Sequence, residues 1–120
     1  MRVFKNTRFD RFAAKEGISD DELKDIVDQL EAGQADADLG GGVFKVRKAR
    51  PGEGKAGGYR VIVFFRSGDK TFFQYGFAKS ALANISEKQL RILKRTAKDL
   101  FLLSDDQIKA VLKTGKLIEI

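Results

Sequence analysis

The middle of the chain contains three short runs with strand composition, and this feature constrains the fold most. Residues 43–49, 59–66 and 70–77 are rich in valine, isoleucine, phenylalanine and tyrosine, which favour β-strands. Ser-Gly-Asp at residues 67–69 separates the last two runs, as expected for a tight hairpin. The second run is apolar on both faces, so we expect it to be a central strand. Together the runs predict a three-stranded antiparallel meander.

Helical patterns lie on both sides of these strands. Three serines each have Glu or Gln three residues later, namely Ser19, Ser86 and Ser104. This spacing predicts helix starts, because the hydroxyl and the later side chain each satisfy a backbone amide. We expect a further short helix over about residues 7–15, and a strand over residues 117–120.

The order of helices, strands and helices predicts an α+β fold. We expect one domain over residues 1–120, with a small antiparallel sheet of about three or four strands. Helices should pack on one face of the sheet, followed by a C-terminal helical extension. The glycine-rich residues 39–42 and 50–58 are expected to be loops.

The sequence contains no histidine and no cysteine. These absences remove the commonest general acid–base, the thiolate nucleophile and the usual zinc ligands. Chemistry would therefore depend on Lys, Arg, Tyr or carboxylates, and we expect no metal and no small-molecule cofactor. Because no apolar run is long enough for a membrane span or a signal peptide, we expect a cytoplasmic protein without a membrane partner.

The net charge of +6 is unevenly distributed. Residues 1–42 contain six basic and ten acidic residues, whereas residues 43–80 contain nine basic and two acidic residues. Residues 81–120 contain eight basic and five acidic residues. This concentration of positive charge favours a polyanionic partner, although a solvated basic face without a partner is an alternative.

Basic residues alternate with apolar residues in the first strand run. Side chains alternate across a strand, so Lys45 and Arg47 should lie opposite Phe44 and Val46. If the apolar pair packs against helices, the two cations lie on the open face with Arg60. Several of these residues also have simple structural interpretations. Lys45 and Arg47 would then protect an edge strand, and Arg60 would pair with Glu53 or Glu31.

Further cations lie near this predicted face. Arg50 and Lys55 belong to the expected loop, and Lys79 follows Phe73, Tyr75 and Phe77 in strand parity. A stripe of basic residues on the helix after Ser86 is more often solvated than binding. Its members are Arg91, Lys94, Arg95 and Lys98.

These motifs, in this order, resemble the RelE/HigB toxin superfamily. The resemblance lies in Phe-Lys-Val-Arg at residues 44–47, the glycine-rich basic loop and arginine at 52–60, and Tyr-Gly-Phe-Ala-Lys-Ser at 75–80. Residues 38–42 and 84–86 are also similar. It implies a toxin of a type II toxin–antitoxin pair, with an antitoxin protein as partner. It further implies a metal-independent endoribonuclease that cleaves mRNA, usually on the ribosome.

The resemblance also implies roles for individual residues. Lys45, Arg47, Arg60 and Lys79 correspond to the basic catalytic residues. Neighbouring cations favour the neutral form of a lysine, so Lys45 is the candidate general base. Arg47 and Arg60 would stabilise the phosphate, and Lys79 would assist the leaving oxygen. The expected RNA-binding residues are Arg50, Lys55, Tyr75, Lys94 and Lys98.

Two departures from the family pattern concern the end of the third strand run. Many RelE members have an arginine after the late lysine and a tyrosine soon after, whereas this chain has Ser80 and no aromatic residue over 81–85. Relatives with the more similar loop commonly have an acid where Ala81 stands. A weakened or inactive toxin is therefore one alternative. Others are a non-catalytic RNA- or partner-binding module of the same fold and a ParE-like gyrase inhibitor.

Overall fold

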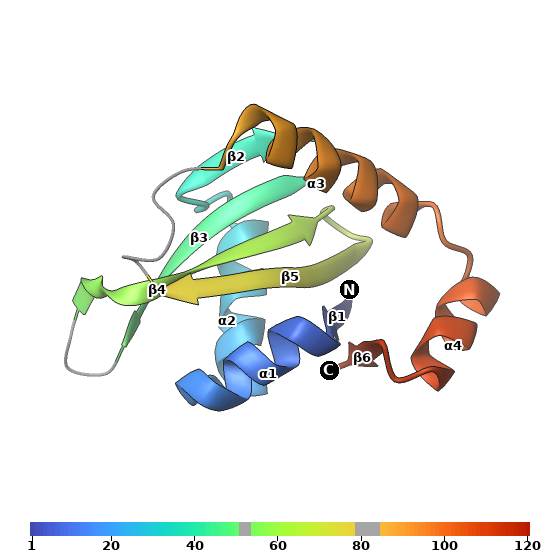
Figure 1. Ribbon diagram of the computed structural model, residues 1–120, viewed down its shortest axis with the longest axis horizontal. Coiled ribbons are helices and arrows are strands. Elements are labelled where there is room, and N and C mark those ends of the chain that lie inside the picture. Colours follow the sequence, from blue (N-terminus) through green and yellow to red (C-terminus); the bar gives the residue numbers. More distant parts are fainter. Residues whose placement is uncertain (51–53, 79–84) are drawn as a thin grey trace.

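Six strands and four helices make up the described part of the protein (Figure 1). The computed structural model describes residues 1–50, 54–78 and 85–120, with side chains at 1–49, 58–78 and 85–120. The elements in chain order are β1 (Arg2–Asn6), α1 (Thr7–Glu16), α2 (Asp20–Glu31), β2 (Ala37–Gly40), β3 (Val43–Arg50), β4 (Gly54–Phe65), β5 (Lys70–Ala78), α3 (Glu87–Phe101), α4 (Asp105–Lys113) and β6 (Leu117–Glu119). No helix in these described ranges is both apolar enough and long enough to span a bilayer.

The strands form one sheet in the order β2-β3-β4-β5-β1-β6. Neighbouring strands are antiparallel, except that β1 pairs with β5 in parallel. The expected α+β class, the meander of β3, β4 and β5 and the last strand are confirmed. The sheet is larger than expected because β1 and β2 join it.

The two additional strands have little strand character in the sequence. In β1 only Val3 and Phe4 are apolar and buried, and the buried residue that follows them is Lys5. In β2 the strand ends in glycine, within the segment expected to be a loop. The expected loop over 50–58 is also shorter, because β4 already begins at Gly54; residues 51–53 lie outside the described part.

All three serine caps predicted from the sequence are present. The hydroxyls of Ser19, Ser86 and Ser104 each accept a hydrogen bond from the backbone amide three residues later. At Ser86 and Ser104 the later glutamine also accepts from the serine amide, completing the capping box. The serines therefore fix where α2, α3 and α4 begin.

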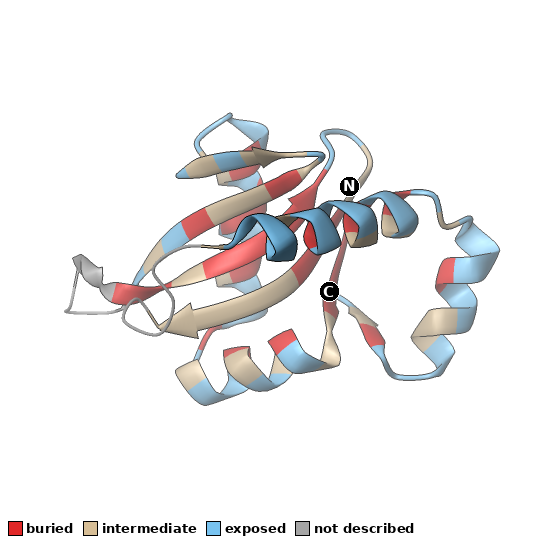
Figure 2. Ribbon diagram, turned by 45° about the horizontal axis from the view of Figure 1, so that its top comes forward, coloured by how far each residue is buried: buried red, intermediate tan, exposed pale blue. Residues whose placement is uncertain are grey.

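Helices cover the two faces of the sheet separately. In Figure 1, α2 passes behind the strands, and in Figure 2, α3 crosses in front of them. Each face has its own apolar cluster. Helices α1 and α2 thus pack on one face, as expected, and the C-terminal helices α3 and α4 pack on the other. We call these the α1/α2 face and the α3 face.

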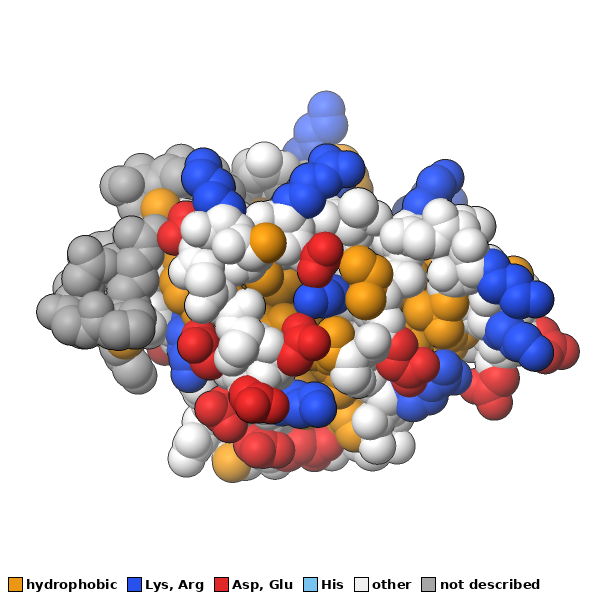
Figure 3. Space-filling view, turned by 90° about the horizontal axis from the view of Figure 1, so that it is seen from below, with side chains coloured by type: hydrophobic (Ala, Val, Ile, Leu, Met, Phe, Trp, Pro, Cys, Tyr) orange, Lys and Arg blue, Asp and Glu red, His pale blue; other side chains and the backbone are white. Residues whose placement is uncertain are grey.

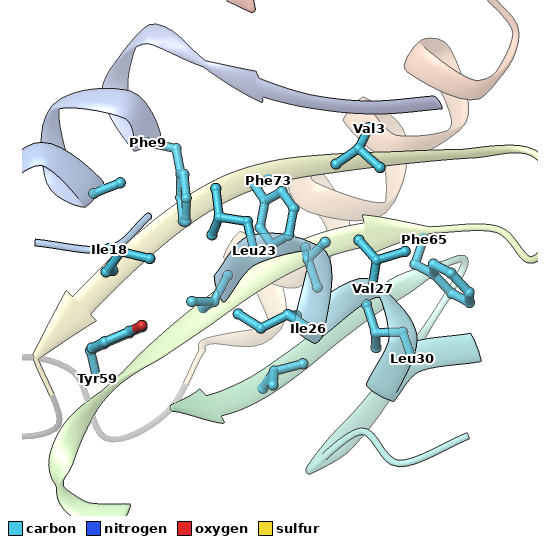
Figure 4. Close-up of a cluster of buried hydrophobic side chains, with 14 residues drawn as sticks. Val3, Phe9, Ile18, Leu23, Ile26, Val27, Leu30, Tyr59, Phe65 and Phe73 are labelled. Carbon is cyan, nitrogen blue, oxygen red and sulfur yellow. The ribbon is translucent and has the colours of Figure 1, made fainter. Parts of the chain in front are cut away.

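The α1/α2 face is closed by large apolar side chains. Phe9 from α1 and Leu23 and Ile26 from α2 are fully buried and point toward the strands around Phe73 (Figure 4). Helix α1 approaches β5 so closely that a Cβ on Gly76 would lie 2.1 Å from the Phe12 ring. A side chain at this position would displace the helix.

A β-bulge in β5 changes which side chains share a face. Phe73 is the partner of Val63, but Ile62 pairs with Tyr75, so Gln74 is an extra residue. Phe73 therefore belongs to the cluster on the α1/α2 face, whereas Tyr75 and Phe77 pack on the α3 face. The predicted common parity of these three aromatic residues was wrong, because an inserted residue reverses the alternation.

Candidate functional site

Strand β3 directs two of its cations to the α3 face. Phe44 and Val46 pack in the cluster of the α1/α2 face, and Val43 packs in the opposite cluster. Because side chains alternate along a strand, Lys45 and Arg47 lie on the α3 face with Val43. The prediction that these two cations lie opposite Phe44 and Val46 is confirmed.

Strand β4 adds Arg60 beside them. Arg47 and Arg60 are direct cross-strand partners, and Lys45 is the partner of Ile62. Neighbouring strands are about 5 Å apart, so two arginines stand side by side on one face. We call Lys45, Arg47 and Arg60 the cation row.

Arg60 is half-buried and its Nε atom is fully enclosed. Within the described ranges this Nε has no hydrogen-bond partner. Glu31, one of the two acids considered for it, lies on α2 and accepts a hydrogen bond from the Ser67 hydroxyl at 2.8 Å. Glu53, the other, lies outside the described residues. A buried donor without a partner is costly unless a ligand satisfies it.

The cation row is not neutralised by the acidic residues that the structure describes. None of them forms an ion pair with Lys45, Arg47 or Arg60. The carboxylate of Asp36 accepts a hydrogen bond from the Arg47 backbone amide, not from its guanidinium. Clustered like charges without counter-charges favour binding of an anion.

An apolar cavity adjoins the cation row. Its volume is about 330 Å³ and it lies between the sheet and the start of α3. The sheet contributes Ile62, Tyr75, Gly76 and Phe77, and the α3 side contributes Ile85, Gln89, Ile92 and Leu93. Two residues that line the cavity pair with members of the cation row: Ile62 is the cross-strand partner of Lys45, and Phe77 is the partner of Arg60. The cavity therefore lies directly beside these two cations.

Of the remaining predicted residues, two that the structure describes lie on α3, away from the cation row. Lys94 and Lys98 are exposed on α3, and the Lys94 side chain lies against the Gly40–Gly42 turn, with Nζ 3.1 Å from the position of a Cβ on Gly40. Lys79 lies outside the described residues, as do the side chains of Arg50 and Lys55. Only Tyr75 among the predicted RNA-binding residues is described next to the cation row.

The helices on the two faces carry opposite charge. Helix α2 contains six acidic residues and one lysine, whereas α3 contains five basic and two acidic residues. In the space-filling view, acidic side chains crowd one border and basic side chains the opposite border (Figure 3). Among the residues described, no three acidic side chains are grouped so as to hold a metal ion.

The arrangement can stabilise a phosphate on which negative charge develops. Fixed cations aimed at such a group act without the cost of reorganising solvent. Aromatic and aliphatic side chains beside them offer a surface for a flat, apolar group. The combination of a cation row and an aromatic-lined cavity fits a phosphodiester whose base contacts the protein.

The chain matches one known protein family over its whole length. Residues 1–120 match the sequence model for the RelE toxin of the RelE / RelB toxin-antitoxin system. No curated protein sequence matches the chain.

Proposed function

Because the chain belongs to the RelE toxin family, we propose that this toxin of a toxin–antitoxin system is a metal-independent endoribonuclease that cleaves mRNA on the translating ribosome. The observation that carries the proposal is the cation row, and above all the buried Nε of Arg60, which lacks a partner within the described ranges. A phosphate oxygen would satisfy that donor and neutralise the adjacent arginines. Ribosomes and mRNA place this activity in the cytoplasm.

The reaction we propose needs no histidine. The ribose 2′-hydroxyl attacks the adjacent phosphorus, and its proton passes to Lys45 as the general base. Arg47 and Arg60 stabilise the charge that gathers on the phosphate oxygens in the transition state. The bond to the 5′-oxygen breaks, and Lys79 supplies the proton to that leaving oxygen. The products are a 2′,3′-cyclic phosphate and a free 5′-hydroxyl.

Other cations bind the RNA away from the reaction centre in this proposal. Arg50, Lys55, Lys94 and Lys98 bind flanking phosphates, and Tyr75 offers a ring to a base. The antitoxin partner that family membership implies would inhibit the toxin by covering this positive face. An acidic or apolar segment of the antitoxin fits that role.

The test is mRNA cleavage during translation. Purified protein is added to a reconstituted bacterial translation reaction, and primer extension locates cuts in the message. We expect discrete cuts that require ribosomes, and a loss of roughly 10²- to 10³-fold in cleavage rate for Lys45→Ala and Arg60→Ala. Lys48→Ala is the matched control, because Lys48 is on the same strand but pairs with Tyr59 of the opposite cluster.

Each other outcome contradicts the proposal in a specific way. An intact message with folded wild-type protein excludes the nuclease. If the message stays intact and the protein alters DNA supercoiling in a gyrase assay, it is a gyrase inhibitor. If it binds RNA in a salt-dependent way without cleaving it, it is a binding module. Equal losses in Lys45→Ala and Lys48→Ala would show that the cation row has no special role.

A further inference from the structure

Arg8, on the first turn of α1, contacts Tyr75, a residue that lines the cavity, from the edge of the sheet. Strand β1 pairs with β5 only as far as Phe73, so α1 begins beside the second half of β5. The Asn6 side chain fixes this corner by donating to both the backbone and side-chain oxygens of Gln74, at 3.2 and 3.0 Å. The guanidinium carbon of Arg8 consequently lies 4.4 Å from the centroid of the Tyr75 ring.

Tyr75 links Arg8 to the site already described. Its ring lines the cavity and also contacts the Arg8 guanidinium. In the sheet, Tyr75 pairs with Ile62, which pairs with Lys45. Arg8 is exposed and forms no ion pair with a described acidic residue. Its charge is thus free to attract phosphate, and its flat group holds the ring in place.

The opposite wall of the cavity comes from the start of α3. Ile92 contributes an apolar surface that is 57% exposed. Gln89 contributes a polar group: its Oε1 accepts from the Ser86 amide in the capping box, while its Nε2 has no partner among the described residues. The cavity is therefore apolar with one free side-chain donor at its α3 wall.

We propose that Arg8 and Tyr75 form one wall of a nucleobase site, in which one unstacked base of the RNA lies between Tyr75 and the Ile92 side of α3. The proposal rests on the proposed function, because the RNA would be held by the cation row. It adds Arg8 as a positioning residue and Gln89 as the donor to the base edge. A base is the occupant that fits, since it is flat, has an acceptor-bearing edge and is attached to the phosphate that the adjacent cations bind.

The chemistry of the neighbourhood favours a base over an apolar peptide side chain. Arg8 lies beyond Tyr75 at one side of the cavity, and Lys45 and Arg60 lie at the other, so a ligand that carries phosphates is favoured over an uncharged side chain. Cations on two sides of an aromatic-lined cavity match a base flanked by two phosphates.

The experiment separates contacts to the base from contacts to phosphate. The probe is a fluorescently labelled 2′-O-methyl oligoribonucleotide of mixed sequence, which lacks the attacking hydroxyl and is not cleaved. Its twin has the same backbone but no bases. Binding of both is measured by fluorescence anisotropy at low salt for wild-type protein, Arg8→Ala and Arg11→Ala. Arg11 is the matched control, because it is an exposed arginine one turn further along α1.

We expect wild-type protein to bind the base-bearing probe roughly tenfold more tightly than the abasic twin, the size expected for one stacked base. Arg8→Ala should remove most of this preference, and Arg11→Ala should keep it. Tyr75→Phe should also keep it, because the ring remains, whereas Tyr75→Ala should lose it.

Two results would overturn the inference. One is equal or undetectable binding of both probes by wild-type protein. The other is an equal effect of Arg8→Ala and Arg11→Ala on the preference for the base-bearing probe, which would show that Arg8 contributes only its positive charge and does not position the base. Either result leaves cleavage by the cation row to be judged independently in the translation reaction, so failure of this inference and failure of the proposed function are distinguishable.

Discussion

The two faces of the sheet differ in how completely they are closed, although the same strands supply both. On the α1/α2 face, Phe9, Leu23 and Ile26 seal the strands and the flanking helix α2 is acidic. On the α3 face, the apolar cluster around Phe72 and Phe101 covers only part of the sheet. The rest carries the cation row and the cavity. Both faces thus bury apolar clusters, but among the described residues only the α3 face also carries the cation row and the cavity.

The largest difference should appear in stability, and two residues on one strand test it. Phe73→Ala removes a fully buried ring from the α1/α2 face, and we expect it to lower the free energy of unfolding by about 3–5 kcal/mol. Tyr75→Ala removes a half-buried ring from the α3 face and should cost about 1 kcal/mol. Urea unfolding of both variants measures this. Equal losses would contradict the assignment of the faces and the bulge at Gln74.

Lys5 provides a second test of the closed face. Its ammonium is bound by Asp10 at 2.8 Å and Asp20 at 3.0 Å, joining β1 to α1 and to the start of α2. We expect Lys5→Met to destabilise the protein by about 1–2 kcal/mol, less than for a fully buried pair because both carboxylates reach solvent. Chemical denaturation at neutral pH measures the loss. A variant as stable as wild type would show that apolar packing alone holds this corner.

The contribution of Lys5 to the free energy of unfolding should change with pH in a definite direction. Burial alone would lower the pKa of Lys5, but hydrogen bonds to Asp10 and Asp20 raise it above its ordinary value of 10.5. A raised pKa means that the contribution is fully present below pH 10.5 and is lost as the pH rises through the folded-state pKa. The stability difference between wild type and Lys5→Met should therefore be constant from neutral pH to about 10 and decrease above it. A decrease that is complete by pH 9 would contradict this sign.

The start of α3 provides a smaller test on the open face. Ser86→Ala removes the hydroxyl that accepts from the Gln89 amide at 3.1 Å, so we expect a loss of about 1 kcal/mol. Because this turn forms one wall of the cavity, amide hydrogen exchange should accelerate in residues 87–93 while α2 keeps its protection. Ser19→Ala is the matched control: it should accelerate exchange at the start of α2 and leave residues 87–93 protected. Uniform acceleration would mean that the two faces do not open independently.

The smallest effect concerns repulsion within the cation row. Lys45→Gln removes one of three neighbouring cations, so at low salt we expect a gain in stability of a few tenths of a kcal/mol. Added salt should abolish the gain by screening. Thermal unfolding at low and high salt measures it, with Lys48→Gln as the control on the opposite face. A loss of stability in Lys45→Gln would mean that Lys45 makes a structural contact.

The sequence predicted the features that depend on local periodicity. The capping serines and the alternation of β3 required only neighbouring residues, so the starts of three helices and the face of Lys45 and Arg47 followed directly. The bulge at Gln74 did not, because an extra residue in a strand leaves no regular signal in the sequence.

Features built from distant segments were not predicted. Strand β1 was missed because its burial depends on partners β5 and β6 and on acids that neutralise Lys5. The cavity was missed because its walls come from three separate elements. Arg8 was missed because nothing local places the first turn of α1 beside Tyr75. These contacts exist only after β1 has paired with β5.

The position of β1 between β5 and β6 also determines when the protein can assemble. The first strand of the chain pairs with residues 70–73 on one side and with residues 117–119 on the other. Both pairings of β1 can therefore form only when almost the whole chain has been synthesised. Such distant pairings slow folding, because each requires a long loop to close first. During synthesis the α1/α2 helices therefore emerge with their apolar sides unprotected. The half-made chain is exposed to aggregation and proteolysis until β3, β4 and β5 can cover those apolar sides, and β1 keeps an unpaired edge until β6 joins it.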